Sequence, residues 1–247
     1  MREKAETQKL ACRWQLTAVQ KRYFRVKCVL DRILGVLGLI LLSPVFLVIV
    51  VAVKIEDGFR APVIFRQKRV GIHGTYFQLL KFRSMKLDTP HDCPTHLLKN
   101  PDQYITRIGR FLRKTSLDEL PQLWNIAAGS LSVVGPRPAL WNQEDLIALR
   151  EEYGVQQVKP GLTGLAQISG RDELEIEEKA LLDRTYVEHL GFRMDVRCFF
   201  GTFLAVLRSD GVVEGGTGAM EKIPGEDESR VKEKTAGEVS GGSENIE

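Results

Sequence analysis

Cysteine and histidine are scarce in this chain, and neither is spaced for a disulfide framework or a structural metal site. The 247 residues include four cysteines and four histidines. The cysteines are scattered without a C-x-x-C pair, which indicates reduced thiols in a cytosolic setting. His91, Cys93 and His96 are close in sequence, but their spacing fits no zinc pattern and Pro94 interrupts it. We therefore expect a surface loop there.

A large net charge is also absent. The formal charge of +3 is too small to indicate nucleic acid as a partner. The charges are nevertheless unevenly placed, because residues 1–32 contain nine Lys or Arg and three acids. Aromatic and aliphatic residues, including Leu16, Tyr23 and Phe24, alternate with these basic residues, a pattern typical of an amphipathic helix lying on anionic lipid. Residues 211–247 are acidic and poor in apolar side chains, which predicts a disordered tail.

One long run has no charge at all. Residues 33–53 read ILGVLGLILLSPVFLVIVVAV, and these 21 residues would form a helix about 31 Å long, enough to match the hydrocarbon core. A secretory signal is not expected, since the run starts late and no small-residue cleavage site follows. Pro44 removes one helical hydrogen bond at its midpoint, and Ser43 is placed to bond the freed carbonyl. Gly35 and Gly38 are expected at close-packing positions.

Basic residues flank this run on both sides, and the positive-inside rule keeps such flanks in the cytoplasm. A helix that bends at Ser43-Pro44 and returns would satisfy both flanks. Charge alone therefore favours re-entry into the membrane, with a tilted and kinked span as the alternative.

Two short strands are predicted after the apolar run. Residues 63–65 and 76–80 are rich in β-branched and aromatic side chains, and a turn at 71–74 lies between them. Lys81 and Arg83 follow the second strand and form part of a cationic patch.

Adjacent carboxylates stand out in the stretch TSLDELPQLWN, residues 115–125. Ser116 and Glu119 fit a capping box, in which both side chains bond amides of the first helical turn. Pro121 argues against that interpretation, because proline is tolerated only in a first turn. We expect a helix from about Asp118 or Glu119 to near Gly129, with Asp118 among free amides suited to phosphate oxygens.

Two further motifs bear cations. SVVGPRP predicts a short strand followed by a stiff turn that carries Arg137. VKPGLTGLAQISGRDEL predicts a largely non-helical, glycine-rich loop with Lys159 and Arg171. Residues 173–208 have helical patterns.

Taken in order, FRQKRVG, KFRSM, LRKTSLDELPQLWN, SVVGPRP, KPGLTGLAQISGR and YVEH resemble the bacterial sugar transferases, or monotopic phosphoglycosyl transferases, in their small form. The resemblance covers about residues 27–207 and implies an α+β, mostly helical fold with short strands. Together with the composition of the flanking regions, which lie outside the resemblance, it divides the chain into a basic amphipathic region (1–32), a re-entrant membrane helix (33–53), a catalytic domain at the cytoplasmic face (54–210) and the acidic tail (211–247).

The resemblance implies transfer of sugar-1-phosphate from a UDP-sugar to polyprenyl (undecaprenyl) phosphate, with release of UMP. This reaction would start exopolysaccharide, capsule, lipopolysaccharide O-antigen or glycoprotein glycan synthesis at the cytoplasmic face of the bacterial inner membrane. Membrane lipid is an implied partner, nucleic acid is not, and homo-oligomerisation is left open. Asp118 would be the nucleophile and a Mg²⁺ ligand, and Glu119 a base or second metal ligand.

The residue chemistry is compatible with that reaction, because attack on a diphosphate requires cations to spread the developing charge. Arg137 offers a bidentate fork for phosphate. Weaker candidates for the same pocket are Lys81, Arg83, Lys159 and Arg171. A carboxylate nucleophile would form a covalent acyl phosphate and divide the exchange into two steps.

Two alternatives remain at this point. A membrane-bound glycosyltransferase would move the sugar without its phosphate and release UDP. A non-enzymatic membrane scaffold would account for the basic and apolar segments, but it leaves the Asp-Glu, GPRP and KPG motifs without a purpose.

Overall fold

The computed structural model describes residues 15–89, 101–170 and 174–208. The predicted acidic tail, the cluster formed by His91, Cys93 and His96, and the candidate phosphate ligand Arg171 lie outside this range.

Two long helices meet at the predicted Ser-Pro break. Helix α2 (Ala18–Leu41) and helix α3 (Ser43–Asp57) are bent by 61° where they join. Pro44 lies in the first turn of α3, where a missing amide is tolerated, and the Ser43 hydroxyl donates to the Ile40 carbonyl at 2.8 Å. The predicted bond from Ser43 to a freed carbonyl is confirmed. Helix α2 continues unbroken through residue 32, so the expected boundary there is not a boundary between elements.

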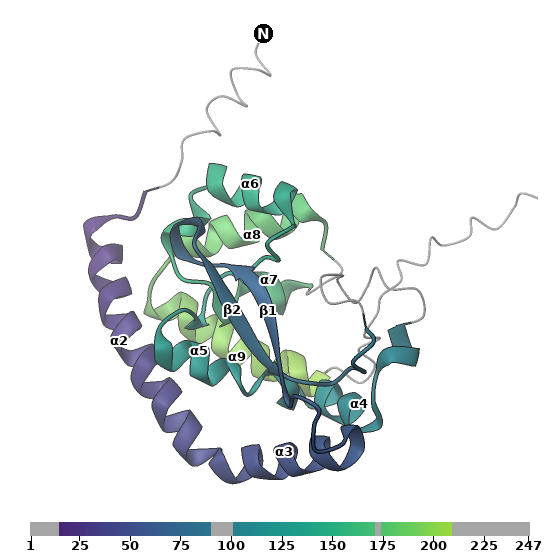
Figure 1. The fold of residues 1–247 in the computed structure, drawn as a ribbon. Coiled ribbons are helices and arrows are strands. Elements are labelled where there is room, and N and C mark those ends of the chain that lie inside the picture. The colour runs from purple at the N-terminus through teal and green to yellow at the C-terminus, as the bar shows by residue number, and fades with distance from the viewer. Residues whose placement is uncertain (1–14, 90–100, 171–173, 209–247) are drawn as a thin grey trace, which may run out of the picture. The chain divides into compact units, whose positions relative to one another are not determined.

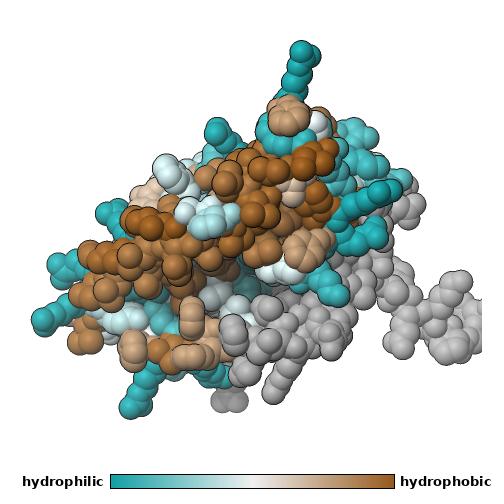
Figure 2. Space-filling view, turned by 90° about the horizontal axis from the view of Figure 1, so that it is seen from below, coloured by the Kyte–Doolittle hydropathy of each residue, from teal (hydrophilic) through white to brown (hydrophobic). Residues whose placement is uncertain are grey.

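Exposed apolar side chains cover the outer side of this bent pair. Figure 1 shows α2 along one side of the domain with α3 turning beneath it, and Figure 2 shows a broad hydrophobic surface from below. The exposed residues include Leu30, Leu34, Leu37, Leu47 and Val48. In the part of the chain that the structure describes, no helix alone has the length and apolarity to cross a membrane, whereas the bent pair together does.

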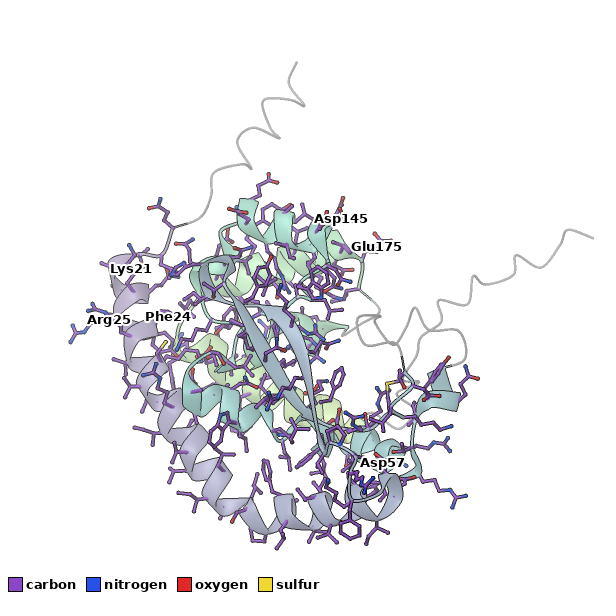
Figure 3. All side chains as sticks on the ribbon, viewed as in Figure 1. Lys21, Phe24, Arg25, Asp57, Asp145 and Glu175 are labelled. Atoms are coloured by element: carbon purple, nitrogen blue, oxygen red, sulfur yellow. The ribbon has the colours of Figure 1, made fainter. Side chains whose placement is uncertain are left out.

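The inner side of α2 packs on the domain. Leu16, Tyr23 and Phe24 join a core cluster with Tyr186 and Val187, and Figure 3 shows Phe24 directed toward the domain while Arg25 points away. The expectation that these three side chains face lipid is therefore wrong. Helical periodicity marks an apolar stripe, but it does not distinguish a lipid surface from a protein surface.

Close packing between α2 and α5 (Gln122–Ala128) explains two glycines. A Cβ at Gly35 would lie 2.7 Å from the Ala127 amide nitrogen, and one at Gly38 would lie 3.2 Å from the Leu123 side chain. The predicted close-packing role of Gly35 and Gly38 is confirmed.

The predicted strand pair is present and longer than expected. Strands β1 (Ile64–Val70) and β2 (Tyr76–Phe82) pair antiparallel, from Ile64 opposite Phe82 to Val70 opposite Tyr76. A short 3₁₀ turn, η1 (Ile72–Gly74), joins them. Gly74 takes a φ of 73°, which an L side chain rarely adopts.

A second, parallel pair joins β3 (Ser132–Val134), as predicted from SVV, to β4 (Gly161–Thr163). The stretch expected to be a largely non-helical loop contains strand β4 and one short helix, α7 (Leu165–Ser169), which the sequence pattern did not predict. Gly164 and Gly170 flank α7 and do not disrupt it.

The remaining elements make the fold mostly helical, as predicted. The α-helices are α4 (Arg107–Lys114), α6 (Glu144–Glu152), α8 (Ile176–Glu188) and α9 (Phe192–Arg208). The 3₁₀ helices are η3 (Pro101–Tyr104), η4 (Leu117–Glu119) and η5 (Val155–Gln157). Helices α6 and α8 pack together at the end of the domain opposite α3 (Figure 1).

Candidate active site

The two adjacent carboxylates lie in η4, between α4 and α5. Ser116 precedes this turn with a left-handed φ of 55°, and its side chain makes no capping bond. The capping-box interpretation is therefore wrong for Ser116 and Glu119. The 3₁₀ turn also delays the regular helix, which begins at Gln122 rather than at Asp118 or Glu119.

Glu119 is held by two cations from different parts of the chain. Its Oε1 lies 2.8 Å from the Lys81 ammonium at the end of β2, and 3.2 Å from Nη2 of Arg137. Burial raises the pKa of Glu119, but Lys81 and Arg137 outweigh it and hold that pKa well below its usual range. Glu119 is therefore ionised and connects Lys81 to the loop that bears Arg137.

Asp118 has a different environment. It is buried, with 7% of its surface exposed, and its nearest cation, Lys81, lies 3.9 Å from Oδ2. Burial raises the pKa of Asp118, opposed first by Lys81 and also by Arg113 and Arg137. The site thus contains one carboxylate that is paired with two cations through Oε1 and a second whose negative charge is only weakly compensated.

Arg113 was missed as a site residue. It lies on α4 with its side chain half-buried, and its Nε donates to the Ser84 hydroxyl at 3.0 Å. Its charge lowers the pKa of Asp118. The sequence feature that could have identified Arg113 is its position five residues before Asp118, across a short turn.

Three carbonyls fix the loop that carries Arg137. The Arg137 carbonyl accepts from Arg150 at 2.8 Å, the Pro138 carbonyl accepts from Arg69 at 2.8 Å, and the Ala139 carbonyl accepts from the Val70 amide at 3.0 Å. These bonds hold the backbone of the loop, so the guanidinium of Arg137 is directed to Glu119 from a rigid base.

Arg150 is in turn held by Asp183 of α8. The Arg150 Nε lies 2.9 Å from Asp183 Oδ2, and both side chains are almost fully buried. Neither residue was singled out from the sequence, because the pair is formed by residues far apart in the chain.

The other predicted phosphate ligands do not all join this group. The charge of Arg83 acts on Asp57, at the end of α3 (Figure 3), and Arg83 is not among the cations that affect Asp118. Lys159 is half-buried beside Gly135, and no other described residue forms an ion pair with it. The structure therefore assembles Asp118, Glu119, Lys81 and Arg137 from the predicted set.

The residues fit a divalent cation that takes most of its ligands from substrate. Within the described ranges, no group of three His, Cys, Asp or Glu side chains could hold a metal ion by itself. Mg²⁺, however, is commonly held by one or two carboxylates together with phosphate oxygens and water. Asp118 meets that requirement, because it is buried and its nearest cation is 3.9 Å away.

Several known proteins are similar in sequence to this chain over most of its length. A transferase from Klebsiella pneumoniae, named UDP-glucose:undecaprenyl-phosphate glucose-1-phosphate transferase, is 44% identical over 179 residues, covering 70% of this chain and 38% of the relative. The uncharacterized sugar transferase EpsL of Bacillus subtilis is 39% identical over 184 residues, covering 74% and 88%. The exopolysaccharide production protein ExoY of Sinorhizobium fredii is 36% identical over 195 residues, covering 73% and 85%.

The matched region makes up a different share of each relative. It spans about two fifths of the Klebsiella protein and most of the other two. The family described as bacterial sugar transferase matches residues 22–209, which include most of α2, all of α3 and every residue of the candidate site. This chain therefore belongs to the bacterial sugar transferase family.

Proposed function

We propose that the protein transfers sugar-1-phosphate from a UDP-sugar to polyprenyl phosphate, forming a polyprenyl-diphosphate sugar and UMP. Family membership and the names of the relatives support this reaction. The observation that carries it is the contrast between the two carboxylates. Glu119 is neutralised by Lys81 and Arg137, whereas Asp118 retains an almost unpaired negative charge beside the same cations.

The proposed mechanism has two displacements at one phosphorus. An Asp118 carboxylate oxygen attacks the phosphorus attached to the sugar, and the bond from that phosphorus to the bridging oxygen breaks, so UMP leaves. A phosphate oxygen of the polyprenyl phosphate then attacks the same phosphorus and breaks its bond to Asp118. The carboxylate is thereby regenerated, and the soluble donor and lipid acceptor need not be bound together.

Cations are required because both attacking groups are anions. Lys81 and Arg137 are placed to stabilise charge on the phosphoryl oxygens. Asp118 would hold Mg²⁺ together with the donor phosphates, and Glu119, whose Oε1 is already bound to Lys81 and Arg137, is a secondary ligand. The bound ion would neutralise phosphate charge.

We also propose that α2 and α3 enter the membrane and return to the cytoplasmic face of the inner membrane. The bend of 61°, the exposed apolar side chains and the basic flanks support re-entry. Single cysteines introduced as Lys21→Cys and Arg60→Cys, with the native cysteines changed to serine, test the topology. Both should resist an impermeant thiol reagent until the inner membrane is opened. Labelling of either one in intact spheroplasts would contradict re-entry.

Nucleotide product analysis tests the reaction itself. Purified protein should be incubated with polyprenyl phosphate, Mg²⁺ and a panel of UDP-sugars. We expect UMP together with a polyprenyl-diphosphate sugar. Release of UDP would instead support the glycosyltransferase alternative, and no turnover with any donor would favour the scaffold. A positive result would place the protein at the first membrane step of a surface glycan.

A further inference from the structure

Gln122 has a buried side chain that the fold leaves without a partner. It is the first residue of α5, and only 2% of its surface is exposed. Its amide nitrogen, Nε2, is buried and has no hydrogen-bond partner within the described chain. A buried amide without a partner destabilises a protein, and such groups commonly have a ligand or a functional role.

Asn125, one turn later on the same helix, has a carboxamide whose oxygen and nitrogen both form hydrogen bonds within the protein. Its Oδ1 accepts from the Leu80 amide at 3.0 Å, and its Nδ2 donates to the Gln78 carbonyl at 2.8 Å. These bonds attach α5 to the free edge of β2. Residues three apart lie on one side of a helix, so Gln122 occupies the same side without making an equivalent bond.

The position of Gln122 relates it to the reacting group. Backbone bonds from Leu120 to Leu117, from Leu123 to Leu120 and from Trp124 to Pro121 make one nearly continuous helical path from η4 into α5. Gln122 therefore follows Asp118 by about one turn. Along β2, Asn125 contacts Gln78 and Leu80, and Glu119 contacts Lys81. In the order of the chain, Gln122 therefore lies between Glu119, which contacts Lys81, and Asn125, which contacts Gln78 and Leu80.

We propose that Gln122 binds the phosphoryl group that is transferred, with Nε2 donating a hydrogen bond to one of its non-bridging oxygens. The inference rests on the proposed function and assigns Gln122 a further substrate-binding role in it. The unpaired atom is a donor, so its partner must be an acceptor, and the reaction brings phosphoryl oxygens to Asp118. A neutral donor also suits this position, because it can stabilise charge on the phosphoryl group without neutralising the nucleophile.

The decisive variant is Gln122→Met, which keeps the approximate volume and removes the amide. No bond within the protein is lost, so we expect the melting temperature to stay level or rise. The kcat/KM for UMP release should fall by about 10²-fold. The loss should be equal for different UDP-sugars, because all share the phosphoryl group. A loss confined to one sugar would overturn the phosphoryl assignment.

Asn125→Leu is the matched control on the same side of α5. It removes two bonds to β2 and should lower the melting temperature, while the folded fraction keeps its kcat/KM. If Gln122→Met behaved in this way, the side chain would be structural and the inference would be wrong. The wild-type enzyme tests the proposed function separately from the role of Gln122. If it releases no UMP, the proposed function fails, whereas normal activity in Gln122→Met overturns only the role of Gln122.

Discussion

The ammonium of Lys81 lies 2.8 Å from Oε1 of Glu119 but 3.9 Å from Oδ2 of the neighbouring Asp118. This difference of about an ångström separates the roles of two carboxylates that are adjacent in sequence. Glu119 shares its charge with Lys81 and Arg137, and Asp118 is left as the carboxylate with capacity for an electrophile or a cation.

Removing the Lys81 charge should impair Asp118 and Glu119 together. Because Lys81 lowers the pKa of both carboxyl groups, we expect Lys81→Met to shift the acid limb of the pH–kcat/KM profile to higher pH. The kcat/KM at neutral pH should fall by about 10²-fold. Lys68→Met, which removes an exposed lysine from β1, is the control and should leave the acid limb in place. An unshifted limb in Lys81→Met would contradict the electrostatic role of Lys81.

The ionised side chain of Asp118 should lower the stability of the folded protein while being required for its activity. Burial raises its pKa in the folded protein, so its contribution to stability is fully present below the unfolded pKa and is lost as pH rises through the folded pKa. At neutral pH the ionised group is therefore unfavourable for folding. Asp118→Asn should raise the melting temperature at pH 7 and reduce UMP release by at least about 10³-fold.

The same shift predicts the activity profile of the wild-type enzyme. Only the ionised carboxylate can attack phosphorus, so activity should rise with pH through an apparent pKa above the ordinary aspartate value of 3.8. Initial rates of UMP release between pH 4 and pH 8, with stability checked at each pH, measure this limb. A rate independent of pH across the whole range would argue against Asp118 as nucleophile.

The buried pair of Arg150 and Asp183 should support both the fold and the loop that carries Arg137. Asp183→Asn would leave the Arg150 charge uncompensated, and we expect the free energy of unfolding to fall by about 3 to 5 kcal/mol. Glu188→Gln, which breaks the more exposed pair with Arg184, should change it by less than about 1 kcal/mol. Urea denaturation of both variants provides the comparison.

Gly35 should be sensitive to a single methyl group. A Cβ there would meet the backbone of α5 at Ala127, which cannot move as a side chain can. Gly35→Ala should therefore destabilise the protein by about 1 to 3 kcal/mol. Gly191→Ala, whose Cβ would have no neighbour nearer than 3.8 Å, is the control. Equal stability of Gly35→Ala and wild type would show that α2 and α5 are not tightly packed.

Local patterns predicted much of the fold. The β1–β2 hairpin follows from aromatic and branched residues around a glycine turn, and the break between α2 and α3 follows from Ser43-Pro44. The inner side of α2 could not be predicted, because an apolar stripe packs equally well on lipid or on protein. Helix α7 was missed because Gly164 and Gly170 suggested a loop, whereas they lie at its two ends.

Only some residues of the candidate site could be predicted from the sequence. The resemblance identified Asp118 and Glu119, residue chemistry suggested Lys81 and Arg137, and the structure brings these four together. Arg150, Asp183 and the unpaired amide of Gln122 depend on contacts between distant segments, for which sequence spacing holds no signal. Arg83 shows the opposite limitation, because nearness to Lys81 in sequence did not place its charge beside Asp118.

The most direct measurement is to trap the phosphosugar on Asp118. The purified protein should be mixed with Mg²⁺ and a UDP-sugar, without polyprenyl phosphate, then quenched and analysed by peptide mass spectrometry. We expect UMP in stoichiometric amount and a sugar-phosphate adduct on the peptide containing Asp118, and the adduct should disappear when polyprenyl phosphate is added. Full turnover with both substrates, but neither UMP nor adduct from the donor alone, would contradict the proposed mechanism.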